Sequence, residues 1–313
     1  MPLVLGWVAV EFGLDHLIDP RLEEFVAESR AFYAQRVAGR GPGSREELDA
    51  IRATAIAPAP SDPPAAVELA WAGGRSVPVR LHAPASGAAA SVHLQIHGGG
   101  FYLGSAAGDD VRNRDLADAL GLAVVSVDYR LAPEHPWPAA PDDCEVAALW
   151  LAEHAEGRFG TTTLSLGGFS AGATLAMTTL LRLRDRGISA YGSAVLQFGT
   201  YDLSAQTPAG RLIADEYFLD AYAGPVEDRT HSDLSPIYAD VTGLPPILIV
   251  VGADDVLLQD NLAMAVRLSA ADVDVDVDVD VYPASPHGFT GHATPMARAA
   301  RDGIEAWLRR GPR

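Results

Sequence analysis

The sequence predicts a doubly wound α/β domain with a mostly parallel sheet, and three observations support that prediction. Short, mostly apolar runs recur between residues 92 and 251, as expected for strands buried on both faces of a sheet. Helix-sized stretches lie between them, and most of these end at a glycine. The chain has 313 residues, of which 48% are hydrophobic and 20% charged, so it buries a large core.

The N-terminal part comes before this alternation. An apolar run at residues 3–10 has no basic residue before it and is interrupted by Glu11, so it fits neither a signal peptide nor a membrane span, and we expect a short packed strand or helix. Residues 14–40 carry apolar side chains at helical spacing and end among glycines and a proline, which predicts a helical segment. Residues 67–71 and 77–81 flank a glycine pair and predict an antiparallel hairpin.

The rest of the sheet follows from the alternation itself. We expect strands at residues 92–96, 123–128, 163–166, 194–198 and 247–251. We expect helices at residues 109–120, 142–156, 171–186 and 260–271. Strands that alternate with helices of this length form parallel sheets through right-handed crossovers. The hairpin is therefore expected to enter a parallel sheet from one edge.

Two segments do not fit a plain crossover. Residues 200–245 are too long for one and are rich in aromatic residues and proline, which is typical of a lid over a site. Residues 271–281 alternate valine and aspartate, which predicts a strand with valine inward and aspartate outward. A calcium loop is the alternative, but such a loop needs Gly and Glu where this chain has Val277 and Pro283.

Composition excludes several function classes. The formal net charge is -18, which disfavours binding to nucleic acid or to an anionic membrane surface. All basic side chains apart from histidine are arginine, so Schiff-base lysine chemistry and a P-loop lysine are excluded. The single cysteine, Cys144, can form neither an intrachain disulfide nor a cysteine metal cage, and we expect a cytoplasmic protein with no metal.

A nucleophile motif lies between a predicted strand and a predicted helix. Gly168-Phe169-Ser170-Ala171-Gly172 has the G-x-S-x-G pattern in the strand-turn-helix context that such a serine requires. The glycine loop of His97-Gly98-Gly99-Gly100-Phe101 also follows a predicted strand. Its backbone N–H groups can converge on one point, so we expect Gly99, Gly100 and Ala171 to supply an oxyanion hole. A flexible or phosphate-binding glycine loop is the alternative, and the serine motif would then be unexplained.

A serine nucleophile needs a histidine base that a carboxylate orients. His287 follows the last predicted strand, whereas His231 and His292 lie in the presumed lid and near the C-terminal helix. Asp254 and Asp255 both follow the strand at residues 247–251, where active-site groups of open α/β sheets gather. One of these two carboxylates is expected to complete the triad, and the other to cap a helix.

The order of the motifs resembles that of the hormone-sensitive-lipase-like esterases, the bacterial group IV carboxylesterases. The resemblance rests on the two motifs above and on Asp128-Tyr129-Arg130-Leu131-Ala132-Pro133-Glu134-His135-Pro136, Asp255-Val256-Leu257 and His287-Gly288-Phe289. It implies an α/β-hydrolase fold with a mostly parallel eight-stranded sheet, helices on both faces and a helical cap. It also implies a catalytic triad of Ser170, Asp255 and His287, with Asp128 and Arg130 as structural residues.

The same resemblance implies a division of the chain. Residues 1–50 would form part of the cap, residues 51–199 the first part of the catalytic core, residues 200–245 the cap insertion, and residues 246–313 the rest of the core. The family pattern usually has Asp before the nucleophile and Gly two places after Ala171, where this chain has Phe169 and Ala173. Candidate substrate-binding residues are aromatic side chains near these segments: Phe32, Tyr102, Phe169, Tyr217 and Phe218.

These motifs predict a serine carboxylesterase that hydrolyses short to medium acyl esters and needs no cofactor. An acyltransferase, amidase or biosynthetic tailoring enzyme with the same fold is the first alternative, and a binding protein without turnover is the second. Retention of all three triad residues argues against a pure binding protein. The expected partner is a small-molecule ester, and the resemblance is compatible with a homodimer.

Overall fold

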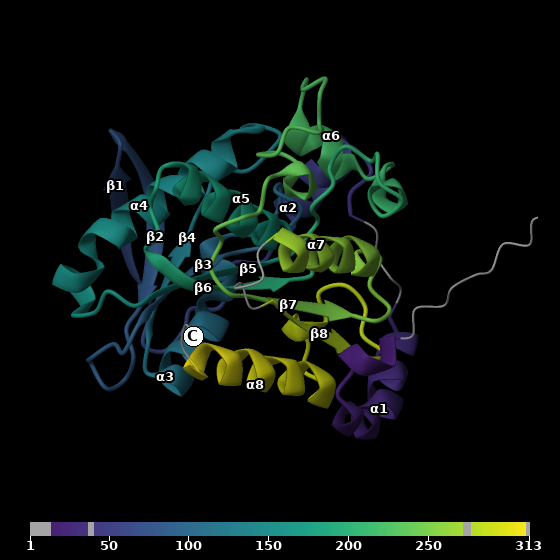
Figure 1. The fold of residues 1–313 in the computed structure, drawn as a ribbon, viewed down its shortest axis with the longest axis horizontal. Helices are drawn as coiled ribbons and strands as arrows, with labels where there is room; N and C mark the ends of the chain where they lie inside the picture. The colour runs from purple at the N-terminus through teal and green to yellow at the C-terminus, as the bar shows by residue number, and fades with distance from the viewer. Residues whose placement is uncertain (1–13, 37–40, 272–276, 311–313) are drawn as a thin grey trace, which may run out of the picture.

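A single eight-stranded sheet organises the molecule (Figure 1). The computed structural model describes residues 14–36, 41–271 and 277–310. The strands are β1 (Ala66–Ala72), β2 (Arg75–His82), β3 (Val92–Ile96), β4 (Ala123–Val127), β5 (Leu164–Phe169), β6 (Tyr191–Gln197), β7 (Ile247–Gly252) and β8 (Val277–Tyr282). Their order across the sheet is β1-β2-β4-β3-β5-β6-β7-β8. Strand β2 pairs antiparallel with β1 and β4, and the pairs from β4 to β8 are parallel.

Helices cover both faces of the sheet. Their bounds are α1 (Glu23–Ala34), α2 (Arg45–Ala53), α3 (Asp110–Leu120), α4 (Ala139–Phe159), α5 (Ala171–Asp185), α6 (Tyr217–Ala223), α7 (Leu258–Ala271) and α8 (Pro295–Arg310). Helices α1, α3 and α8 lie on one side of the sheet, and α4, α5 and α7 lie on the other (Figure 1). This arrangement confirms the predicted fold class.

The central strands are buried along their whole length because helices cover both of their faces. Every residue of β3, β4 and β7 is buried. The larger apolar cluster joins these strands to α4 and α5, whereas a second cluster joins β7 and β8 to α8 and α1. The carboxyl ends of the parallel strands therefore form a well-supported edge, which carries the candidate site.

The predicted N-terminal helical segment is confirmed, but as several short pieces. Helix α1 ends at Ala34, short 3-10 turns at Leu14–Leu17 and Pro20–Leu22 precede it, and a separate helix α2 follows. The Ser44 side chain caps α2 by accepting a hydrogen bond from the Glu47 N–H at 3.2 Å. The Glu47 carboxylate in turn accepts from the Gly43 N–H at 2.7 Å, a variant of the capping box. The run at residues 3–10 lies outside the described residues.

Helix α4 continues beyond its predicted end at Gly157. It ends at Phe159, and Gly160 is the C-cap in the left-handed region at φ 73°. The Arg158 side chain, which the extension includes, pairs with Glu68 and lies 5.4 Å from the centre of the Trp150 ring. Contacts with β1 thus favour the later of two glycine stops.

The valine-aspartate strand is only partly as predicted. Of the predicted segment, the structure describes β8, and residues 272–276 lie outside the description. Val279 and Val281 pack on the core as expected. The Asp278 carboxylate accepts a hydrogen bond from the Trp307 indole N–H at 2.6 Å, so α8 contacts this side of the strand. The Asp278 side chain is still 44% exposed, so it faces outward as expected, although residues 277–280 are half-buried and not fully solvent-facing.

Candidate active site

Ser170 occupies a sharp turn between β5 and α5. Its backbone has φ 54° and ψ -127°, a strained conformation for a residue with a side chain. A Cβ atom at Gly168 would come within 2.3 Å of the Gly172 carbonyl oxygen, and one at Gly172 within 2.1 Å of the Ile96 carbonyl oxygen. Both flanking positions therefore require glycine, and the turn holds the serine hydroxyl above the end of the sheet.

The structure brings Ser170, His287 and Asp255 into one hydrogen-bonded chain. Ser170 Oγ lies 2.9 Å from His287 Nε2, and His287 Nδ1 lies 3.1 Å from both carboxylate oxygens of Asp255. The Asp255 side chain is fully buried, whereas the His287 ring is 36% exposed. Asp254, the alternative carboxylate, is exposed. A base within reach of the hydroxyl, oriented by a buried carboxylate, is the geometry that activates a serine.

Two further contacts hold this chain in place. The Leu257 backbone N–H donates to Asp255 Oδ1 at 2.8 Å, which orients the carboxylate. The Phe198 ring meets the His287 ring edge to face, with 5.0 Å between ring centres. Phe198 was not among the residues selected from the sequence, and its position directly after β6 is the signal that could have identified it.

The glycine loop lies beside the serine turn. Gly99 and Gly100 have φ values of 119° and 59°, so both adopt backbone conformations that favour glycine. Within the described part of the chain, the N–H groups of Gly99, Gly100 and Ala171 donate to no backbone carbonyl. Ala171 is also the first residue of α5, where the helix dipole favours negative charge. These three N–H groups remain available to an external acceptor.

Contacts of His97 and Asp128 hold the chain before and after the glycine loop in place. Burial lowers the pKa of His97 to about 4, so its ring is neutral. The ring stacks on Tyr129 with 4.1 Å between centres, and the Tyr129 hydroxyl donates to the His97 carbonyl oxygen. Asp128 accepts from the Ala106 N–H at 3.0 Å, and Arg130 forms a two-pronged ion pair with Asp143. The contacts of Asp128 and Arg130 are thus structural.

The candidate substrate-binding aromatics fall into two groups. Tyr102, Tyr217 and Phe218 lie together beside the glycine loop, with 6.1 Å between the Tyr102 and Tyr217 ring centres and a Cβ at Gly100 within 3.4 Å of Phe218. Phe169 packs edge to face with Phe198. Phe32 instead contacts Tyr33 and His292 on the α1 side. The structure therefore brings four of the five residues close to the serine turn or glycine loop and places Phe32 in a separate aromatic cluster.

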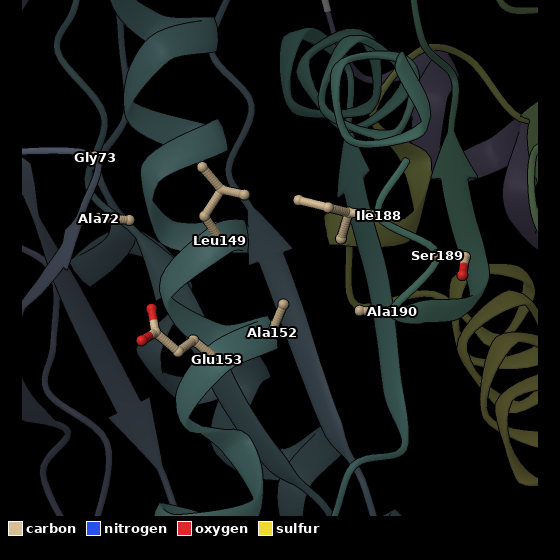
Figure 2. A pocket seen from close by; sticks show the side chains of 8 residues that line it. All are labelled: Ala72, Gly73, Leu149, Ala152, Glu153, Ile188, Ser189 and Ala190. Carbon is tan, nitrogen blue, oxygen red and sulfur yellow. The ribbon is translucent and has the colours of Figure 1, made fainter. Parts of the chain in front are cut away.

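A hollow of about 550 Å³ lies elsewhere on the molecule (Figure 2). Leu149 and Ala152 of α4 and the segment from Ile188 to Ala190 line it, the Glu153 side chain points toward Ala72, and the turn at Ala72 and Gly73 closes one side. That segment enters β6 at its amino end, whereas Ser170 follows the carboxyl end of β5. The hollow contains none of the triad or glycine-loop residues.

The described residues offer neither a metal-binding cluster nor a membrane-spanning helix. Among residues 14–36, 41–271 and 277–310, no three His, Cys, Asp or Glu side chains are grouped so that they could hold a metal ion. In the same ranges, none of the helices combines the length and apolar character needed to span a membrane.

Comparison with known proteins identifies the family. A family model described as the α/β-hydrolase fold matches residues 93–291. The chain belongs to this family. The carboxylic ester hydrolase LipN of Mycobacterium tuberculosis is 32% identical over 81% of this chain and 72% of its own length. The FAD-linked oxidoreductase pytB of Aspergillus terreus is 31% identical over 74% of this chain, but the chain spans only 31% of that protein.

Solved structures give the same result. A hyperthermophilic esterase from Pyrobaculum calidifontis is 28% identical, with a TM-score of 0.75 over 93% of this chain and 98% of its own. A hormone-sensitive lipase from a metagenome library is 30% identical, with a TM-score of 0.72 over 93% of this chain and 98% of its own. These relatives confirm the resemblance to the hormone-sensitive-lipase-like esterases and the prediction that this α/β-hydrolase is an ester-hydrolysing enzyme.

Proposed function

We propose that this protein is a serine carboxylesterase with Ser170 as the nucleophile, His287 as the base and Asp255 as the orienting acid. The observation that carries the proposal is the continuous chain from the Ser170 hydroxyl through the His287 ring to the buried Asp255 carboxylate. Esterase relatives that match most of the chain support the same reaction class.

The reaction follows from this arrangement. His287 Nε2 takes the Ser170 proton while Ser170 Oγ bonds to the ester carbonyl carbon. The carbonyl oxygen becomes negative and accepts hydrogen bonds from the Gly99, Gly100 and Ala171 N–H groups. The protonated imidazole then gives its proton to the departing alcohol oxygen. Water, deprotonated by the same nitrogen, attacks the acyl-enzyme and releases the acid.

The proposed substrates are esters with short to medium acyl chains. Tyr102, Tyr217 and Phe218 provide an apolar wall beside the glycine loop, and each methylene buried there contributes about 0.8 kcal/mol. We assign residues 200–245 and the N-terminal helices to the cap that bounds this space. The cytoplasmic location and the homodimer remain predictions from the sequence.

The decisive experiment is active-site labelling combined with turnover. A fluorophosphonate should label Ser170 alone, and Ser170→Ala should lower kcat for p-nitrophenyl butyrate about a thousandfold or more. Ser189→Ala, at the hollow of Figure 2, is the matched control and should retain full labelling and activity. Label on another serine, or a Ser170→Ala enzyme with normal turnover, would overturn the proposal.

A further inference from the structure

An arginine lies directly beside the serine turn. Arg112, in the first turns of α3, has its guanidinium carbon 5.0 Å from the centre of the Phe169 ring, and Phe169 immediately precedes Ser170. A Cβ at Gly291 would lie 3.1 Å from Arg112 Nη2, and Gly291 is four residues beyond His287. The guanidinium is therefore bracketed by the chain segments that carry the nucleophile and the base.

Two further arginines act on residues that Arg112 also affects, His292 and Arg301. Arg36 lies over the Phe32 ring at 3.7 Å, and that ring is 5.6 Å from the ring of His292. Burial, followed by the charges of Arg36 and Arg112, lowers the pKa of His292. Burial, followed by the charges of Arg112 and Arg298, lowers the pKa of Arg301. We call Arg36, Arg112 and Arg298 the arginine rim.

Within the described residues the arginine rim forms no ion pair, although Asp109 lies close enough to Arg112 for the Arg112 charge to oppose the larger effect of burial, which raises the pKa of Asp109. None of the ion pairs among the described residues includes Arg36, Arg112 or Arg298, although the sequence has 41 acidic residues and only 23 arginines. Arg301 donates its hydrogen bonds to the Thr290 and His292 carbonyl oxygens. Elsewhere, partly buried arginines such as Arg80 and Arg182 are ion-paired. Gathering unpaired like charges is costly unless an anion compensates for them.

We propose that the arginine rim binds a carboxylate on the ester substrate and that Arg112 is a specificity-determining residue. This inference rests on the proposed esterase function and narrows it to anionic esters. A guanidinium presents parallel N–H groups that match a carboxylate, and a cation–π contact with the Phe169 ring keeps this guanidinium beside the serine turn. Position 169 thus places an aromatic ring beside Arg112 where the family pattern usually has a carboxylate.

The test compares matched anionic and neutral esters, because the readout is a ratio of kcat/KM values. For an anion on the acid part, the pair is p-nitrophenyl hydrogen adipate and p-nitrophenyl hexanoate. For an anion on the alcohol part, the pair is 3-carboxy-4-nitrophenyl butyrate and p-nitrophenyl butyrate. In at least one pair, Arg112→Gln should lower the anionic-to-neutral ratio about tenfold, mainly through KM, and Arg112→Lys should restore part of it. High salt should reduce the wild-type ratio because it screens the charges.

Arg158→Gln is the matched control. Arg158 also lies over an aromatic ring, Trp150, and its replacement changes the net charge equally, but it lies at the far end of α4. This variant should leave both ratios unchanged. Arg298→Gln, at an exposed position, tests the rim independently if Arg112→Gln folds poorly, and it should lower the same ratio.

Each outcome decides the question. Equal losses on anionic and neutral esters in both Arg112→Gln and Arg298→Gln, or an equal effect of Arg158→Gln, would overturn the anion site. The esterase function is tested separately: p-nitrophenyl butyrate hydrolysis that survives Ser170→Ala would refute that function, whereas hydrolysis that depends on Ser170 without any charge preference would refute only the anion site.

Discussion

Asp254 and Asp255 are neighbours in the chain, but only the second faces the imidazole. Asp255 is buried, accepts from the Leu257 N–H and lies 3.1 Å from His287 Nδ1, whereas Asp254 is exposed. We expect Asp255→Asn to lower kcat by several orders of magnitude because an amide stabilises the wrong imidazole tautomer. Asp254→Asn, the control, should change kcat less than twofold. Equal losses in steady-state assays of both variants would contradict this assignment.

Asp260, in α7, bonds to the first residues of the long insertion at residues 200–245, and the stability of this contact depends on pH. Its Oδ2 accepts from the Tyr201 and Asp202 N–H groups, and burial raises its pKa from 3.8 to about 6. The folded state therefore holds this proton more tightly than the unfolded chain does. The resulting stability is complete below pH 3.8 and is lost as the pH rises to about 6.

Replacing Asp260 removes this titration. Between pH 4 and pH 7, the free energy of unfolding of the wild type should fall by about 2 kcal/mol relative to Asp260→Asn. Urea unfolding at several pH values measures the difference. Asp185→Asn, at an exposed carboxylate that pairs with Arg184, is the control and should run parallel to the wild type. Parallel curves for Asp260→Asn would show that burial does not perturb this group.

Single residues differ in how far the sequence predicts them. Ser170, His287 and the glycine loop belong to local motifs whose backbone geometry demands particular residue types, so their neighbours in the chain identify them. Arg112 and Phe198 carry no such local signal, because each acquires its place from contacts between segments far apart in sequence. The choice between Asp254 and Asp255 needed the family pattern, since both follow the same strand.

At the scale of elements, strands were easier to predict than helix ends. Strands buried on both faces are continuous apolar runs, and each predicted strand overlaps an observed one. Helix α4 passes one glycine and stops at the next because contacts of Arg158 with β1 stabilise the extra turn. Helix α2 has a local signal, the Ser44 and Glu47 capping pair, which could have been found in the sequence.

Strand β8 shows how a neighbouring helix changes the meaning of a pattern. Period-two alternation predicts two faces but does not say that residues of α8 contact the aspartate face. Because Asp278 accepts from the Trp307 indole and pairs with Arg310, Asp278→Ala should lower the free energy of unfolding by about 1 kcal/mol. Asp278→Asn should retain most of that stability. Thermal unfolding measures both, and kcat/KM for p-nitrophenyl butyrate should not change; a more stable Asp278→Ala would restore the view of these aspartates as mutually repelling.

At the scale of the whole molecule, the two N-terminal helices attach to different sides of the site. Helix α1 packs Val26 against the β8 and α8 cluster, together with Leu22 from the turn before it, and Ser29 donates to the Ala284 carbonyl oxygen at 2.6 Å. Helix α2 is fastened to the glycine-loop side, where Arg52 donates to the Tyr102 carbonyl oxygen and pairs with Glu134. Helix α1 therefore connects the cluster around Phe32 to the core, and helix α2 connects the group around Tyr102. A pocket bounded on both sides requires such an arrangement.

The attachment of α1 is expected to affect both stability and the preference for acyl length. Deleting residues 1–43 removes α1 but retains Ser44, which caps α2. Because the buried apolar side chains of α1 and the Tyr33 contact with His292 at 2.9 Å are lost, we expect a lower melting temperature and exposed apolar surface.

The wild type should gain about fourfold in kcat/KM for each acyl methylene that its pocket encloses, and the deletion should flatten this profile across p-nitrophenyl acetate to decanoate. The double variant Val26→Ala/Ser29→Ala weakens the attachment of α1 without deleting it. It should also lower the melting temperature and flatten the acyl-length profile. A deletion variant that stays stable and keeps the wild-type profile would mean that α1 takes no part in bounding the pocket, and substrate length would then be set by Tyr102, Tyr217 and Phe218 alone.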